Sequence, residues 1–163
     1  MVNKEITDKL NLVLIKAIKD QDLGIVNQLL DILPINSPID ENGMTVLAFA
    51  ACYCFNREIV YAITLRNPNV NIVDKYSRTP LMLAVATTIK LTDPQAMQVN
   101  LDLVNYLIDA GADRNARSSG GETALTYSIQ GGRIKVVGAL LNSAFFPEQM
   151  NGFGQTILDL ARI

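Results

Sequence analysis

One block of about eleven residues recurs four times along this chain. It reads DENGMTVLAFA at 40–50, DKYSRTPLMLA at 74–84, SSGGETALTYS at 118–128 and NGFGQTILDLA at 151–161. Its threonine stands at positions 45, 79, 123 and 156, so the intervals are 34, 44 and 33 residues. A period of about 33 residues, with about eleven extra residues in the middle interval, indicates stacked supersecondary units rather than one closed domain.

Each unit predicts a pair of helices that follows a polar turn. After the turn at 74–77, Thr79 can cap the first free amides of a helix, and Pro80 takes the first helical position, where its missing N–H costs nothing. A second helix follows in each unit, because apolar residues recur there at helical spacing. Gly111 then stands where a left-handed residue would end such a helix without a Cβ penalty.

This pattern resembles the ankyrin repeat. The family signature of an Asp turn, Gly, Thr-Pro-Leu, Ala, a helical Ile/Val-Val, Leu-Leu and Gly-Ala-Asp-x-Asn-Ala is matched best by 74–84 together with 103–116. The resemblance implies an all-α fold, a solenoid of helix-turn-helix repeats with short hairpin loops. It covers about three full repeats plus degenerate terminal repeats.

The resemblance extends over nearly the whole chain, which we expect to form a single ankyrin-repeat domain, 1–163. The expected parts are a degenerate N-terminal repeat at 5–39, repeats at 40–73, 74–117 and 118–150, and a C-terminal half repeat at 151–163. The second full repeat carries an insertion at 88–98, TIKLTDPQAMQ. We expect this insertion to form a surface loop or to lengthen the helical pair, and a role in binding stays open.

Several positions depart from the family pattern. Where the family usually has His, this chain has Ala48, Met82, Thr126 and Asp159. The usual hydrogen bonds between neighbouring hairpins are therefore expected to be lost or replaced. The stretch 144–146 holds Ala-Phe-Phe in place of Gly-Ala-Asp. We expect at least one of these phenylalanines to pack under the fourth hairpin, and the alternative is an exposed anchor.

The composition argues against catalysis. The chain contains no histidine, which removes the commonest general base, the Ser-His and Cys-His nucleophile pairs and His-containing zinc sites. Cys52 and Cys54 lack a second pair for a metal and are interpreted as free thiols in a reducing compartment. The glycine pairs at 120–121 and 131–132 lack the Lys-Ser/Thr of a phosphate-binding loop. We expect no catalytic residue, metal, cofactor or small-molecule substrate.

Charge and hydropathy restrict the partner class. The formal net charge is −2 and no basic stripe is present, which argues against nucleic acid as the main partner. Charged residues between Lys4 and Lys9 interrupt any apolar run long enough for a signal peptide or a membrane span. We therefore expect a cytoplasmic protein without membrane insertion.

Binding to another protein is the natural use of a stack of helical pairs with protruding hairpins, because such a stack presents a long concave surface. In the ankyrin family the contacts usually come from hairpin tips and the exposed face of the first helices. The resemblance places partner-binding residues at Glu41, Asn42, Met44, Tyr53, Lys75, Tyr76, Arg78, Thr87, Ser119, Glu122, Gln130, Arg133, Phe153 and Gln155.

Five of these, namely Met44, Tyr53, Tyr76, Arg78 and Phe153, are expected to contribute most, because aromatic and arginine side chains dominate binding hot spots. Packing between units is the alternative for Tyr53 and Phe153.

The sequence thus predicts a non-catalytic protein-binding module that acts as a scaffold, a targeting module or an inhibitor. One alternative is an N-terminal targeting or regulatory fragment of a longer multidomain enzyme, because the last helix is unfinished at Ile163. Another alternative is a structural spacer. The many Ile, Asn and Lys residues suggest an AT-rich genome, and by analogy with ankyrin proteins of host-associated bacteria the chain is also a candidate effector secreted into a host cell cytosol.

Overall fold

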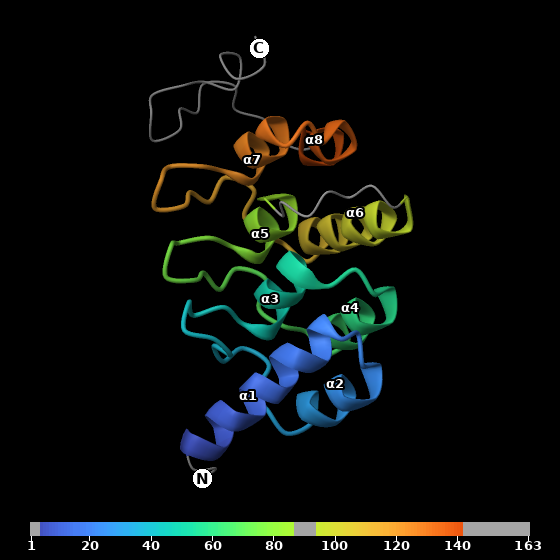
Figure 1. The fold of residues 1–163 in the computed structure, drawn as a ribbon. Coiled ribbons are helices and arrows are strands. Elements are labelled where there is room, and N and C mark those ends of the chain that lie inside the picture. Colours follow the sequence, from blue (N-terminus) through green and yellow to red (C-terminus); the bar gives the residue numbers. More distant parts are fainter. Residues whose placement is uncertain (1–3, 87–93, 142–163) are drawn as a thin grey trace.

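The computed structural model describes residues 4–86 and 94–141, and these ranges are helical apart from the connecting loops (Figure 1). In chain order the described helices are α1 (Lys4–Lys19), α2 (Leu23–Leu30), α3 (Val46–Tyr53), α4 (Arg57–Thr64), α5 (Pro80–Ala86), α6 (Pro94–Asp109), α7 (Ala124–Gln130) and α8 (Ile134–Leu141). An isolated antiparallel bridge joins Pro38 to Thr45. None of the helices just named is both long and apolar enough to cross a bilayer.

The helices are arranged as a stack of pairs. The first helices of successive pairs contact one another, α1 with α3, α3 with α5 and α5 with α7, while α2 contacts α4 and α6 contacts α8 in the other layer. Figure 1 shows the hairpin loops projecting together from one side of the first helices, with α4 and α6 on the opposite side. The all-α solenoid predicted from the sequence is confirmed.

The repeated threonines begin the first helices, as the sequence predicts. The hydroxyl oxygen of Thr45 accepts a hydrogen bond from the backbone amide three residues later at 3.3 Å, and that of Thr79 does the same at 3.2 Å. In α7 the arrangement is reciprocal, because the Thr126 hydroxyl also accepts from the amide of Thr123 at 2.8 Å. Pro80 is the first residue of α5. Each cap satisfies amides that have no partner inside the helix.

The end of α6 also follows the sequence prediction. Gly111 adopts a φ of +84°, and the backbone amide of Ala112 donates to the carbonyl of Leu107 at 2.8 Å. This left-handed residue closes the helix and directs the chain into the next hairpin. The inserted residues at 94–98 lie in α6, which has 16 residues, so this part of the insertion lengthens the second helix.

The core runs through the whole stack between the two helical layers. Leu47, Ile59, Leu81, Leu103 and Leu107 are among its most buried side chains, each at most 2% exposed. Three predictions concern segments that lie outside the described residues: the structure of 88–93, the packing of the phenylalanines at 145 and 146, and the half repeat at 151–163. The repeat boundaries given above stay a prediction.

Candidate protein-binding surface

The hairpin loops hold their shape through side chains that bind their own backbone. Each loop contains a residue whose side-chain oxygen accepts hydrogen bonds from the amides two and four residues later. These residues are Asp40, Asp74 and Ser118, with N···O distances between 2.8 and 3.3 Å. Short polar side chains favour such turns, because they reach the following amides without distorting the chain.

Neighbouring hairpins are joined through the backbone. The amide of Lys75 donates to the carbonyl of Asn42 at 2.9 Å, and the amide of Ser119 donates to the carbonyl of Tyr76 at 2.9 Å. Ala48 and Met82, at positions where the family usually has His, are buried side chains without an N–H or O–H donor. One backbone hydrogen bond thus joins the tips at each of these two joints, and at the second joint the Ser119 hydroxyl also donates to the Ser77 hydroxyl at 3.4 Å.

The second hairpin presents an exposed tyrosine whose ring contacts two cations. The ring of Tyr76, 48% exposed, lies 4.9 Å from the guanidinium carbon of Arg78 and 5.3 Å from Nζ of Lys75. Arg78 is fixed by Asp74, whose Oδ2 accepts a hydrogen bond from its Nε at 2.8 Å and forms an ion pair with its Nη2 at 2.6 Å. Burial acts to lower the pKa of Arg78, but the hydrogen bonds and charge of Asp74 outweigh it and raise that pKa.

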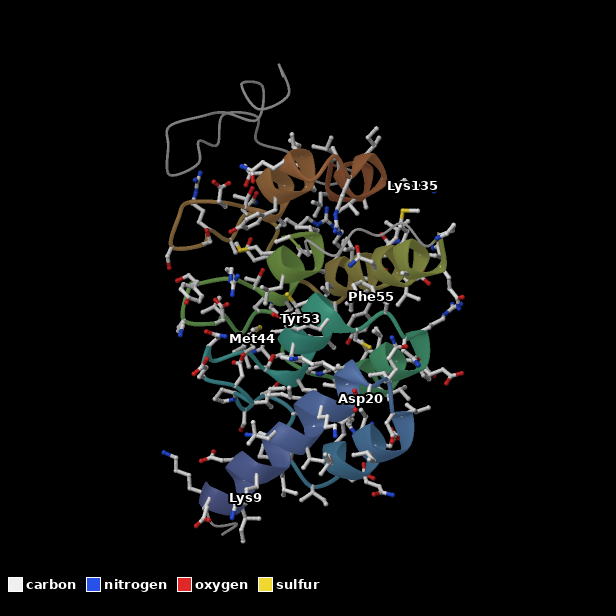
Figure 2. All side chains as sticks on the ribbon, viewed as in Figure 1. Lys9, Asp20, Met44, Tyr53, Phe55 and Lys135 are labelled. Carbon is white, nitrogen blue, oxygen red and sulfur yellow. The ribbon has the colours of Figure 1, made fainter. Side chains whose placement is uncertain are left out.

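A second aromatic group lies on α3. The rings of Phe49 and Tyr53 are 4.6 Å apart at 40°, and Nζ of Lys19 lies 5.7 Å and 5.6 Å from their centroids. Phe49 is buried, whereas Tyr53 is 40% exposed, and Figure 2 shows Tyr53 on α3. Lys19, the last residue of α1, was not among the predicted site residues, and no sequence signal distinguishes it from the other charged residues of α1.

Cys52 connects the two aromatic groups. Its side chain is hydrogen-bonded to that of Tyr53, and Arg78 lies close enough to act electrostatically on both residues. Burial raises the pKa of the Cys52 thiol, and Arg78 offsets this only in part. The negative charge of an ionised Cys52, together with burial, raises the pKa of Tyr53. Both groups are therefore neutral near pH 7, and the phenol of Tyr53 is a hydrogen-bond donor.

We refer to Lys19, Tyr53, Lys75, Tyr76 and Arg78 as the cation–tyrosine surface. The set combines residues from the first helical pair, the second pair and the hairpin that precedes α5. Four of the five residues, namely Tyr53, Lys75, Tyr76 and Arg78, were predicted as partner-binding residues from the sequence. The structure places Lys75, Tyr76 and Arg78 in contact at one hairpin tip.

The remaining predicted residues have mixed positions. Glu41, Ser119 and Gln130 are exposed, and Asn42 is half-buried. Thr87, Phe153 and Gln155 lie outside the described residues. Met44 is 4% exposed and Glu122 is 9% exposed, so the expectation that they offer contact surface is wrong.

The reason for the burial of Met44 and Glu122 is their equivalent place in the hairpin. Each donates its amide to the side chain that opens the turn, and the carbonyl of each accepts an amide at the start of the same hairpin, at 2.8 Å and 2.9 Å respectively. The side chains of both residues are buried at this place in the hairpin, and Figure 2 shows where Met44 lies. Arg78 occupies the same place in its own hairpin, but its longer side chain keeps 28% of its area exposed.

Arg133 has a structural contact where a partner contact was expected. Its Nη1 donates to the carbonyl of Ala84 at 3.2 Å and to Oδ1 of Asn100 at 3.1 Å, and Nδ2 of Asn100 donates to the same carbonyl at 2.9 Å. Burial lowers the pKa of Arg133, although a guanidinium stays charged at neutral pH. Arg133 thus connects α5 and α6 to the loop between α7 and α8.

Two other features bear on chemistry. Over residues 4–86 and 94–141, no group of three or more Cys, Asp or Glu side chains is arranged to hold a metal ion.

A pocket of about 310 Å³ lies between α1 and the loop after α2, and its lining carries no charged side chain. The lining residues are Thr7, Leu10, Asn11, Ile32, Leu33, Pro34 and Ser37.

Comparison with known proteins identifies the repeat type. Residues 95–141 match the family model described as "Ankyrin repeats (many copies)", and this segment contains α7, α8 and nearly all of α6. The chain is 28% identical over 111 residues, or 68% of its length, to the BTB/POZ domain and ankyrin repeat-containing protein NPR3 of Oryza sativa subsp. japonica. It spans 16% of the length of that relative. The resemblance to ankyrin repeats is confirmed, and ankyrin repeats indicate a protein–protein interaction module.

Proposed function

We propose that this ankyrin-type solenoid is a non-catalytic module that binds a protein partner through its hairpin tips and the adjoining end of α3. The observation that supports this most directly is the exposed tyrosine in contact with two cations at the tip of the second hairpin. Tyr76 is about half exposed while Arg78 beside it is fixed by a buried carboxylate. A side chain that is already ordered loses little entropy when a partner covers it.

The proposal is tested by replacing exposed residues without disturbing the hairpin. Arg78 is unsuitable, because its loss would leave the covered carboxylate of Asp74 without its ion pair. We therefore choose the double variant Lys75→Ala/Tyr76→Ala, since both side chains are exposed. Tyr61→Ala is the matched control, because Tyr61 is 62% exposed on α4, in the other helical layer.

Binding is measured by capturing partners from the lysate of the source cells and identifying them by mass spectrometry. We expect a partner that the wild-type chain and the Tyr61 variant retain and that the double variant loses. Circular dichroism confirms that each variant is folded. Equal retention by all three chains contradicts the proposed surface, and if no chain retains a partner the role of a structural spacer is favoured.

A second proposal is that the chain works as the binding part of a longer protein. The observation that favours it is the relative's printed name, which joins ankyrin repeats to a BTB/POZ domain in one polypeptide. Immunoblotting of the source cells with an antibody against residues 94–141 tests this. A band much larger than this chain supports it, and a band of the chain's own mass contradicts it. Fractionation of the same cells tests the cytoplasmic and the secreted locations.

A further inference from the structure

The five residues of the cation–tyrosine surface, which we also call the strip, form two cation–aromatic groups, and Arg78 of one group lies within electrostatic range of Tyr53 of the other. Lys19 lies over the ring of Tyr53, Arg78 acts electrostatically on Tyr53, and both Arg78 and Lys75 lie over the ring of Tyr76. Cations and phenol rings therefore alternate from the end of α1 to the tip of the second hairpin. A partner chain lying along this strip would contact all five residues.

The charge that this strip offers to a partner is positive. Its one internal carboxylate, Asp74, is fully covered, and its two oxygens accept hydrogen bonds from Arg78 and from backbone amides. The ammonium groups of Lys19 and Lys75 are exposed, and within the described ranges neither forms an ion pair. Each is thus available to a carboxylate from outside.

Exposed carboxylates also lie in the segments next to the strip, where they would repel an acidic ligand. Asp20 follows Lys19 and is exposed, and Glu41 is exposed at the tip of the preceding hairpin. Asp40 lies beside Glu41 but uses both oxygens, for amides of its own turn and for the side chain of Asn42 at 3.3 Å. Glu41 is therefore an exposed acid of the preceding hairpin whose oxygens Asp40 does not share, and it should repel an acidic ligand.

The tyrosines add hydrogen-bond donors to the same strip. Tyr53 and Tyr76 are 40% and 48% exposed, so each presents part of its side chain to a partner, although the Tyr53 side chain is also hydrogen-bonded to Cys52. A phenol donates to a carboxylate, while its ring packs against an apolar side chain. A nucleic acid is a poorer fit, because three cations on a chain of net charge −2 neutralise few phosphates.

We infer that the cation–tyrosine surface binds an extended acidic segment of a partner protein, with carboxylates on Lys19, Lys75 and Arg78 and apolar side chains against Tyr53 and Tyr76. The inference rests on the proposed function, to which it adds the chemical class of the partner. Charge complementarity carries the argument, since the strip exposes cations and covers its own carboxylate.

Fluorescence anisotropy with two short labelled peptides tests this inference. One peptide alternates Glu with Leu and Gly, and in the other Lys replaces every Glu. We expect the wild-type chain to bind the Glu peptide and not the Lys peptide, with affinity that falls as salt is added. Lys19→Glu/Lys75→Glu is expected to weaken binding of the Glu peptide by about tenfold. Glu41→Lys is expected to strengthen it.

The matched control makes the same change in net charge elsewhere. Lys9 and Lys135 lie at opposite ends of the solenoid (Figure 2), and both are exposed. Lys9→Glu/Lys135→Glu should leave the affinity for the Glu peptide unchanged. If this control weakens binding as much as the test variant, the net charge of the chain and not the strip is responsible, and the inference is overturned.

Further outcomes separate the inference from the proposed function. If the Glu peptide fails to bind, while the lysate partner is still lost in Lys75→Ala/Tyr76→Ala, the surface binds a partner of another chemistry and only the inference fails. Binding of a labelled oligothymidylate as tight as that of the Glu peptide also overturns it, in favour of a general anion site. Circular dichroism of every variant excludes loss of the fold.

Discussion

The Nε of Arg78 donates a hydrogen bond to one oxygen of Asp74 at 2.8 Å and Nη2 forms an ion pair with the same oxygen at 2.6 Å, while the other oxygen of Asp74 accepts two backbone amides. One carboxylate thus fixes both the backbone of the second hairpin and the cation that lies over Tyr76. Because the side chain of Asp74 is fully covered, these three hydrogen bonds and the ion pair replace the water it has lost.

Replacing Asp74 should therefore be costly. Asp74→Ala removes the two turn hydrogen bonds and leaves Arg78 without its anion, so we expect the free energy of unfolding to fall by about 3 kcal/mol. Asp40→Ala is the control, because Asp40 closes the equivalent turn without an arginine partner, and it should cost about 1–2 kcal/mol. Urea denaturation monitored by circular dichroism measures both. Equal losses would show that the ion pair with Arg78 adds nothing.

The contact of Arg133 with Ala84 and Asn100 should stabilise the joint between the last two described helical pairs. Arg133→Met keeps the aliphatic part of the side chain and removes the donors, so we expect a loss of about 1–2 kcal/mol. Lys135→Met, on the exposed side of α8, should change stability by less than about 0.5 kcal/mol. Hydrogen exchange should show faster exchange in α7 and α8 for the Arg133 variant, and unchanged exchange would contradict a role at this joint.

Two glycines allow backbone strain to be separated from packing. A Cβ added at Gly111 or at Gly138 meets no atom within 4 Å, but Gly111 has a φ of +84° and Gly138 lies within α8. Gly111→Ala should destabilise the chain by about 1 kcal/mol. Gly138→Ala should stabilise it by about 0.5–1 kcal/mol. Thermal unfolding midpoints measure the pair, and a shift of the same sign for both would contradict this account.

The two cysteines should react slowly with iodoacetamide at neutral pH. Burial raises the pKa of both thiols, which lowers the fraction of reactive thiolate. Cys54, 3% exposed, should react more slowly than the half-buried Cys52. Mass spectrometry of the alkylated peptides against free cysteine gives the rates. A Cys52 thiol as reactive as free cysteine would contradict the raised pKa.

The same raised pKa values predict how stability depends on pH. Between the unfolded and the folded pKa, the folded thiols keep their protons while the unfolded ones lose theirs. Stability should therefore fall as pH rises above about 8.5, the ordinary pKa of a cysteine. Thermal unfolding midpoints across this range measure the fall, which Cys52→Ser/Cys54→Ala should reduce. A double variant with an unchanged pH dependence would assign the fall to other groups.

The features that the sequence predicts correctly are local. Thr45, Thr79 and Thr123 cap helices because each cap depends on the amide three residues later, and the turn at Gly111 depends on a hydrogen bond between residues five apart. The burial of Met44 depends instead on a backbone pairing across its hairpin, which sets the direction of the side chain and leaves no trace in residue type.

The sequence also did not predict contacts between residues that are far apart in the chain. Arg133 reaches a carbonyl 49 residues earlier, and Lys19 packs on rings that lie two loops later in the chain. No sequence motif marks Arg133 or Lys19, because a charged residue in or next to a helix is expected to be exposed to solvent. Only the packing of one helical pair on the next places these side chains, so the composition of the cation–tyrosine surface required the structure.

The backbone hydrogen bonds from Lys75 to Asn42 and from Ser119 to Tyr76 give the row of hairpins a fixed pitch. Residues at equivalent positions of successive hairpin tips are therefore separated by a regular distance. A flexible partner segment can satisfy several tips at once only if its own side chains recur at a compatible interval. Selection among partners with similar composition would then depend on the spacing of their residues as well as on their charge.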